Sequence, residues 1–150
     1  MQRIIREENL VENVRKQGVL LGELLHIHLD DHPYVGNVRG KGLFWGVSET
    51  TRIKWKWQSL MTGQIEFVAD KKSKEPFPPS AGIANAVYTK GLNDLGISLY
   101  PGTGTKNGVD GDHVLLSPAY TSTEEEIEEI ALKVKETIFR AFDELKLTRR

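Results

Sequence analysis

Residues 100–118 read YPGTGTKNGVDGDHVLLSP, and this stretch decides the fold that the sequence predicts. A short strand, Ile97 to Tyr100, ends at Pro101 and is followed by a loop rich in glycine; a second strand from His113 to Ser117 then ends at a proline. Glycines let the backbone of such a loop approach a ligand closely. The stretch is therefore either a plain connection between two strands or a loop that faces a ligand.

Helices are predicted on both sides of this stretch. After it, Thr121-Ser122-Thr123 precedes three glutamates and offers overlapping capping boxes, and an apolar stripe runs from Ile127 to Leu145. Before it, apolar residues recur at helical steps from Glu7 to Leu29. A further helix is expected from Ser80, as its N-cap, to the stop at Gly96.

Strands are predicted between the first two helices. Residues 35–47 alternate glycine with large apolar residues, so we expect two short strands separated by the turn Arg39-Gly40-Lys41-Gly42. The lysine cluster at 71–74 and the prolines after it predict a solvated loop. The expected fold class is α+β, with a small, mainly antiparallel sheet covered by helices, in one domain spanning residues 1–150.

The composition excludes several functional classes. The net charge of -1 gives no general attraction to nucleic acid or to an anionic membrane. The chain has no cysteine, which excludes disulfides, thiolate metal sites and a cysteine nucleophile. No apolar run approaches the roughly 18 residues of a membrane span. We expect an intracellular, by default cytoplasmic, protein with no nucleic-acid or membrane partner; a mitochondrial location stays open because the true N-terminus can lie upstream.

Three patterns suggest a metal site, an acid-base pair and a dinucleotide-binding loop, but the spacing of their residues does not favour any of them. His26 and His28 would point to different faces of a helix and are not expected to bind one metal ion. Asp112 and His113 are adjacent on a strand and point to opposite faces, so a direct acid-base pair is not expected. Gly102-x-Gly104 lacks the third glycine and the helix of a dinucleotide-binding fingerprint. We therefore assign no catalytic, cofactor-binding or metal-binding residue from spacing alone.

Two stretches carry a family pattern: residues 100–118 with the acidic helix after them, and residues 35–46, which read VGNVRGKGLFWG. Both resemble the C-terminal small domain of the class III (omega-type) pyridoxal-phosphate-dependent aminotransferases, and the resemblance extends from about Glu7 to about Leu145. It implies the α+β fold of the C-terminal domain of fold-type I enzymes. It also implies part of a transaminase that transfers an amino group between an amine or amino acid and a keto acid.

The same resemblance implies that a large domain is absent from this chain. In the family, that domain supplies the Schiff-base lysine, the aspartate at the pyridine nitrogen and most phosphate contacts. The chain alone is therefore expected neither to hold pyridoxal phosphate nor to catalyse, and the full-length enzyme is expected to be a homodimer. Since the small domain closes over the substrate, the resemblance makes these residues candidates for a substrate-side loop: Tyr100, Gly102, Thr103, Gly104, Asp112 and His113.

Residues 47–64 do not fit this pattern. Their removal would join Gly46 to Ile65 and restore a strand that resembles the uninterrupted one of the family. We interpret Val47 to Gln64 as an insertion. Within it, Arg52-Ile53-Lys54-Trp55-Lys56-Trp57 interleaves basic and aromatic residues, but a hairpin strand with one wet face is favoured over a nucleic-acid or membrane contact.

Two alternatives to an enzyme part stay open at this point. The chain could be an α+β interaction module that kept the fold without the chemistry, or a gene-model fragment with no function of its own. A small domain separated from its partner should expose apolar surface on its first helix and its sheet.

Overall fold

The computed structural model describes residues 2–45 and 64–147. The helices are α1 (Gln2–Glu7), α2 (Leu10–Leu29), the 3-10 turn η2 (Pro79–Ala81), α3 (Ile83–Lys90), the π-helical segment η3 (Gly91–Leu95) and α4 (Glu124–Leu147). The strands are β1 (Val35–Lys41), β2 (Phe44–Trp45), β3 (Gln64–Asp70), β4 (Glu75–Pro76), β5 (Tyr100–Thr103) and β6 (Asp112–Leu115).

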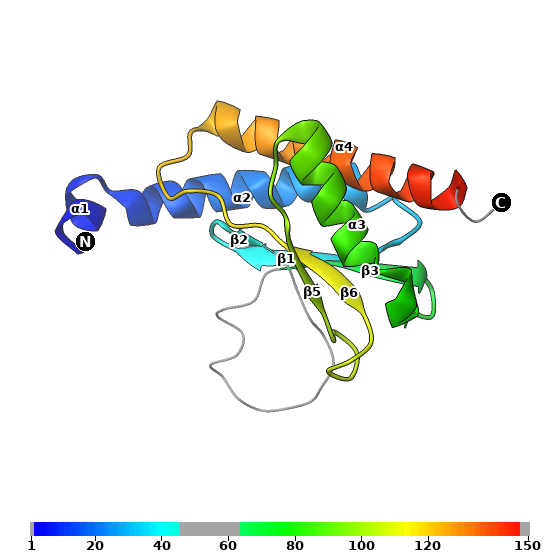
Figure 1. Cartoon of the computed structure of the whole chain (residues 1–150). Helices are drawn as coiled ribbons and strands as arrows, with labels where there is room; N and C mark the ends of the chain where they lie inside the picture. The colour runs from blue at the N-terminus through cyan, green and yellow to red at the C-terminus, as the bar shows by residue number, and fades with distance from the viewer. Residues whose placement is uncertain (1, 46–63, 148–150) are drawn as a thin grey trace.

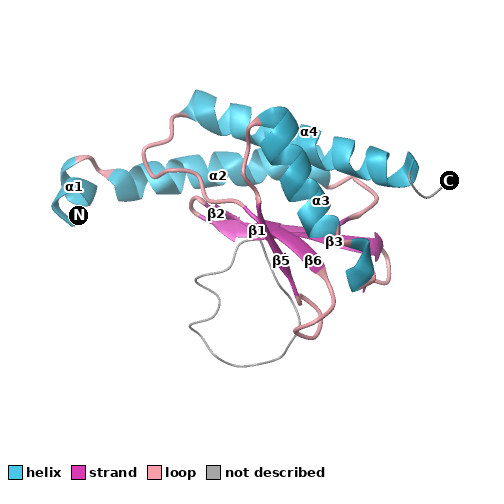
Figure 2. Cartoon of the chain, in the orientation of Figure 1, coloured by secondary structure: helices cyan, strands magenta, loops and turns pink. Residues whose placement is uncertain are grey.

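All the strand pairs are antiparallel, and the pairings link the strands as β2-β1-β3-β6-β5, with β4 also paired to β3. Helices α2, α3 and α4 lie on one side of this sheet (Figures 1 and 2). The predicted α+β fold, a small antiparallel sheet covered by helices, is confirmed.

The core lies between the sheet and these helices. In the middle strand β3, Ile65 is opposite Val38 of β1 and Val114 of β6, and all three side chains are buried. Phe67 lies two residues further along β3 and contacts Phe142 of α4 edge-on. The predicted apolar stripe of α4 is confirmed, because its buried members are Ile127, Ala131, Val134, Ile138, Ala141 and Phe142.

The ends of the two long helices are set by local hydrogen bonding. At the start of α4, the Thr123 backbone N–H donates to the Glu126 carboxylate at 2.9 Å, and the Glu126 N–H donates to the Thr123 hydroxyl at 3.3 Å. This is the third of the three predicted capping boxes. The first helix differs from its prediction: it is broken at Glu8 and Asn9, where Asn9 has φ 50°, so α2 begins at Leu10.

The turn after β1 is shorter than predicted. Arg39 to Lys41 belong to β1, and Lys41 pairs with Phe44, so the turn consists of Gly42 and Leu43. Gly42 has φ 59°, a conformation that side chains with a Cβ disfavour. Helix α2 packs directly on this turn, because a Cβ on Gly18 would lie only 2.3 Å from the Gly42 carbonyl oxygen.

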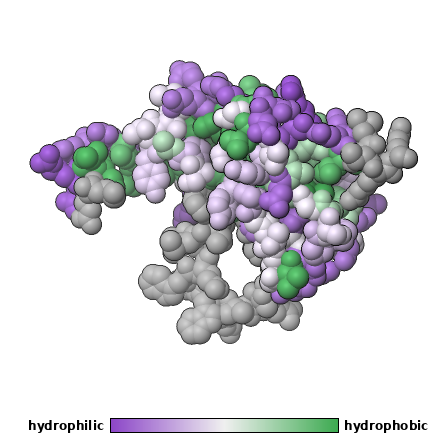
Figure 3. Space-filling model, in the orientation of Figure 1, coloured by the Kyte–Doolittle hydropathy of each residue, from purple (hydrophilic) through white to green (hydrophobic). Residues whose placement is uncertain are grey.

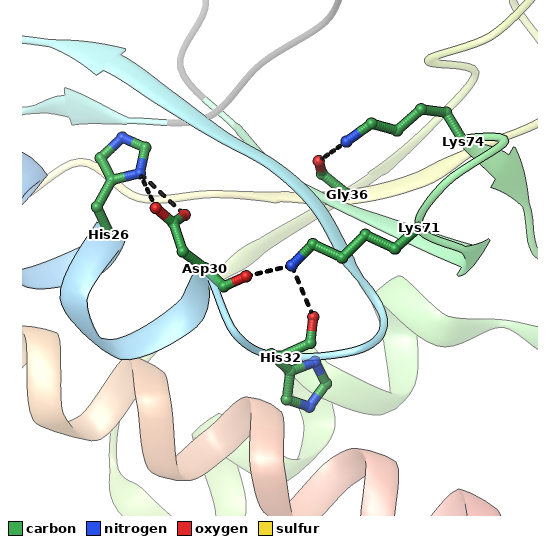
Figure 4. Close-up of polar contacts among 6 residues, drawn as sticks. All are labelled: His26, Asp30, His32, Gly36, Lys71 and Lys74. Carbon is green, nitrogen blue, oxygen red and sulfur yellow. Dashed lines mark hydrogen bonds and ion pairs between the residues drawn. The ribbon is translucent and has the colours of Figure 1, made fainter.

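The lysine cluster at 71–74 is largely exposed, as predicted, and two of its lysines also donate to backbone carbonyls (Figure 4). The Lys71 ammonium donates to the carbonyls of Asp30 and His32, the latter at 3.0 Å, and the Lys74 ammonium donates to the carbonyl of Gly36. The Asp30 carbonyl is at the C-terminus of α2, where a positive charge is favourable, and Gly36 is the second residue of β1. The two lysines therefore fasten the connection between α2 and β1.

The predicted insertion falls almost entirely outside the described residues. Of Val47 to Gln64, only Gln64 is described, and it is the first residue of β3. The basic and aromatic run from Arg52 to Trp57 lies outside the described residues as well.

Candidate functional site

The candidate substrate-side residues lie on the hairpin formed by β5 and β6. Tyr100 pairs with Leu115, Gly102 with His113, and Thr103 with Asp112. Both strands are displaced from their predicted positions: β5 begins at Tyr100 and includes Pro101, and β6 begins one residue early. Proline has no backbone N–H to donate to a neighbouring strand, so it is disfavoured in a central strand. Strand β5 accommodates Pro101 because β5 is the last strand in the order of pairing and has a neighbour on one side only.

The glycine-rich loop of this hairpin is closed by its own hydrogen bonds. The Asn107 side-chain oxygen accepts from the N–H groups of Val109 and Asp110, and the Lys106 N–H donates to the Asp110 carbonyl at 2.9 Å. Gly104 has φ 89°, which this tight turn requires. The loop points away from the helices (Figure 1), and an apolar spot shows in its region of the space-filling view (Figure 3). Val109 of this loop is exposed. Because its N–H groups bond within the loop, it is not an open cradle for a phosphate.

Asp112 faces the helices and has a structural role. Its carboxylate accepts a hydrogen bond from the N–H of Ile83, the first residue of α3, at 2.7 Å, and its side chain is 4% exposed. Burial raises the pKa of Asp112, and the backbone N–H groups of Ile83 and Ala84 act against this rise. The predicted cap, Ser80, lies instead within η2, and the residue before α3 is Gly82, which has no side chain to cap with. Asp112 therefore caps α3 from a neighbouring strand.

His113 lies on the other face of the same strand. It is opposite Gly102 on one side and Glu66 on the other, and its ring lies against Gly102, where a Cβ would be 2.2 Å from Nε2. The side chain is 8% exposed, and its Nδ1 has no hydrogen-bond partner among the described residues. Burial lowers the pKa of His113, so the ring is neutral at pH 7. Asp112 and His113 do not form a pair, as the alternation of strand residues predicted.

The structure thus divides the candidate residues between two faces of the hairpin. Tyr100, which is 69% exposed, shares the face of Gly102 and His113 because side chains two apart on a strand point the same way. Thr103 pairs with Asp112 and shares its face. Sequence reasoning missed Glu66, whose place opposite His113 follows only from the register of β3 on β6.

Two grooves lie elsewhere on the described surface. One groove of about 720 Å³ lies between the start of α2 and the start of α4, and another of about 480 Å³ lies between α3 and α4. No residue of β5 or β6 lines either groove. The two grooves are therefore separate from the hairpin that carries the candidate residues.

The histidines near the end of α2 have structural contacts. His26 bonds through Nδ1 to the Asp30 carboxylate at 3.0 Å (Figure 4), and His32 packs against Phe139 and Phe142. Within residues 2–45 and 64–147, no three histidine or acidic side chains come together in a way that could hold a metal ion. In the same part of the chain, no helix is long and apolar enough to span a membrane.

Comparison with known proteins finds aminotransferases. The chain is 55% identical over 141 residues to an aminotransferase of Gibberella zeae, covering 94% of this chain and 24% of that protein. It is 40% identical to an uncharacterized aminotransferase of Schizosaccharomyces pombe, covering 92% of this chain and 26% of that one. It is 34% identical to a taurine-pyruvate aminotransferase of Bilophila wadsworthia, covering 85% and 23%. No family model matches the chain.

Solved structures agree with these relatives. A transaminase from work on directed evolution by ancestral reconstruction superposes with a TM-score of 0.73 at 26% identity, covering 95% of this chain and 26% of that one. The adenosylmethionine-8-amino-7-oxononanoate aminotransferase of Methanocaldococcus jannaschii gives 0.68 at 27% identity, covering 93% and 25%. The chain therefore spans about a quarter of the length of the proteins that it resembles, and its fold is that of one part of a transaminase.

The cap on α3 can be tested by replacing Asp112. Asp112→Ala removes the acceptor of the Ile83 N–H, so we expect the free energy of unfolding to fall by about 1 kcal/mol, within the range of lost helix caps. Asp112→Asn keeps an acceptor oxygen without a buried charge and should stay closer to the wild-type protein at pH 7. Urea denaturation followed by circular dichroism measures both, and an alanine variant as stable as wild type would show that the cap contributes nothing.

The burial of His113 predicts a dependence of stability on pH. Because its pKa in the folded protein is lowered from 6.5, the unfolded chain binds the proton first as the pH falls. The free energy of unfolding should therefore decline as the pH falls below about 6.5 and show no contribution from this group at pH 8. His28, whose pKa is also lowered by burial and by Lys135, adds to the same slope.

The His113→Gln variant separates the two histidines. Glutamine cannot take up the proton, so the decline between pH 6.5 and pH 5.5 should be smaller than in the wild-type protein, and smaller still in the double variant with His28→Gln. Urea midpoints at pH 8, 7, 6 and 5.5 give the slopes. An unchanged slope in His113→Gln would contradict the burial of a neutral ring at this position.

Proposed function

We propose that this chain is the C-terminal small domain of a class III, pyridoxal-phosphate-dependent aminotransferase. The observation that carries the proposal is the 55% identity to the aminotransferase of Gibberella zeae over 94% of the chain. The similarity to solved transaminases at TM-scores of 0.73 and 0.68 supports it. The reaction would be the transfer of an amino group between an amine or amino acid and a keto acid, in an enzyme that is a homodimer when complete.

The described residues do not fit a pyridoxal phosphate site of their own. The cofactor supplies an aldehyde that takes up the amino group, and it needs a lysine and a partner for its ring nitrogen. Lys16, Lys90, Lys106 and Lys133 pair with carboxylates on the surface, and Lys71 and Lys74 donate to backbone carbonyls. Asp112, the buried carboxylate of the described residues, is bound to the start of α3.

We therefore assign the cofactor lysine and the aspartate to a large domain outside this chain. This chain would contribute the side of the active site that closes over the substrate. On the face of the hairpin away from the helices, the Tyr100 phenol is exposed, while the neutral His113 ring packs on Gly102 and excludes water from that point of the sheet. Asp112 would act only indirectly, because it fixes α3 under the hairpin.

Replacing the matched part of a relative with this chain tests the proposed function. In a chimera, the 141-residue match of the Gibberella zeae aminotransferase is exchanged for this chain. We expect the chimera to bind pyridoxal phosphate and to transfer an amino group from at least one donor of a panel containing amines, amino acids and taurine to pyruvate. The rate should lie within about tenfold of the parent, a loss of about 1.4 kcal/mol in the transition state.

Two substitutions in the chimera test the proposed substrate side. Tyr100→Ala should lower kcat/KM by about tenfold or more, whereas Glu128→Ala, at an exposed charged position of α4, should leave it unchanged. A chimera that folds and binds the cofactor but transfers no amino group would contradict the proposal. That outcome would favour the alternative of an interaction module without chemistry.

A further inference from the structure

Strand β1 pairs with two strands that are far apart in the sequence. In β2, Phe44 is opposite Lys41 and Trp45 is opposite Gly40. In β3, Gln64 is opposite Arg39. The neighbouring residues Gly40 and Arg39 therefore face Trp45 and Gln64.

The two pairings share one register. In an antiparallel pair, each step back along one strand is a step forward along its partner. Arg39 precedes Gly40, so the residue opposite Arg39 should follow Trp45 directly. It is Gln64 instead, and the ladder continues from there, with Val38 opposite Ile65, as though the chain between Trp45 and Gln64 were absent.

We propose that β2 and β3 are two parts of one strand along one edge of β1, and that residues 46–63 are an insertion that leaves the register of this strand unchanged. The sequence pattern predicted the insertion at 47–64. The two segments have the same length, and they differ only in whether Gly46 or Gln64 stands opposite Arg39. Since Gln64 occupies that position, the structure favours 46–63.

The length of a deleted segment would decide whether the residues of β3 keep their places in the core. Ile65 and Phe67 are fully buried on the face of β3 that meets the helices, and Glu66 points the other way. A slip of one residue moves every side chain of a strand to the opposite face. Removal of a segment shorter or longer by a single position would therefore turn Ile65 and Phe67 out of the core or force a bulge, whereas removal of 46–63 would not.

The candidate site lies downstream of the proposed junction. Strand β6, which carries Asp112 and His113, pairs with β3 through residues 65–67, downstream of the proposed junction. A chain without residues 46–63 keeps these pairs. The shortened chain should therefore present the same hairpin, so the inference holds whether or not the proposed enzymatic function is right.

Three deletions made in the full chain test the register. In Δ46–63, Trp45 is joined to Gln64; Δ46–62 removes one residue fewer and Δ46–64 one residue more. We expect Δ46–63 to unfold in one cooperative transition in urea, with a midpoint equal to or above that of the full chain, because a shorter connection costs less entropy to close. The other two deletions should unfold at clearly lower urea.

Backbone nuclear Overhauser contacts give the pairing directly. In Δ46–63 we expect contacts between Val38 and Ile65 and between Gly40 and Trp45, as in the full chain. If Δ46–63 is unfolded, or if its urea midpoint does not exceed the midpoints of Δ46–62 and of Δ46–64, then β2 and β3 are not one strand and the proposal is wrong. Loss of the contact between Gly40 and Trp45 in a folded Δ46–63 would overturn it as well.

Discussion

The structure depends on the position of β3 between β1 and β6, with its alternate side chains under the helices. Ile65 and Phe67 are fully buried there, and each is held by a partner in the strand on either side. Apolar burial of this kind is the largest favourable contribution to folding, at roughly 25 cal/mol for each Å² removed from water. Once these two residues are fixed, the faces of the residues paired with them and with Glu66 on β6 follow from the pairing.

This constraint gives the neighbours Asp112 and His113 different tasks. Asp112 is opposite Phe67, on the helix side, where its carboxylate meets the first N–H of α3. His113 is opposite Glu66, on the other side, where burial keeps its ring neutral. A sequence motif that suggests one acid-base pair is thus a cap on one face and a packed ring on the other. The face with His113 and Tyr100 is the one that we propose meets the substrate or the rest of the enzyme.

Much of the fold could be predicted from local patterns, and the exceptions have a common cause. The capping box at Thr123 and the apolar stripe of α4 depend on residues three or four apart, which the sequence displays directly. The cap of α3 comes from Asp112, 29 residues away, so the local candidate Ser80 was wrong. The acceptors of Lys71, the carbonyls after α2, are 39 to 41 residues distant, so the local pattern could predict an exposed loop but not these hydrogen bonds. For the candidate site, alternation predicted that Asp112 and His113 diverge, but only the pairing shows which faces the helices.

We propose that this chain is one part of an aminotransferase and that the cofactor lysine lies outside it. The most direct test is to incubate the purified chain with pyridoxal phosphate, reduce with borohydride and locate lysine adducts by mass spectrometry. We expect absent labelling, or weak labelling scattered over several lysines, because six of the described lysines pair with surface carboxylates or backbone carbonyls and the buried Asp112 carboxylate caps α3. A single lysine labelled in a one-to-one ratio would contradict it and would show that the chain holds the cofactor by itself.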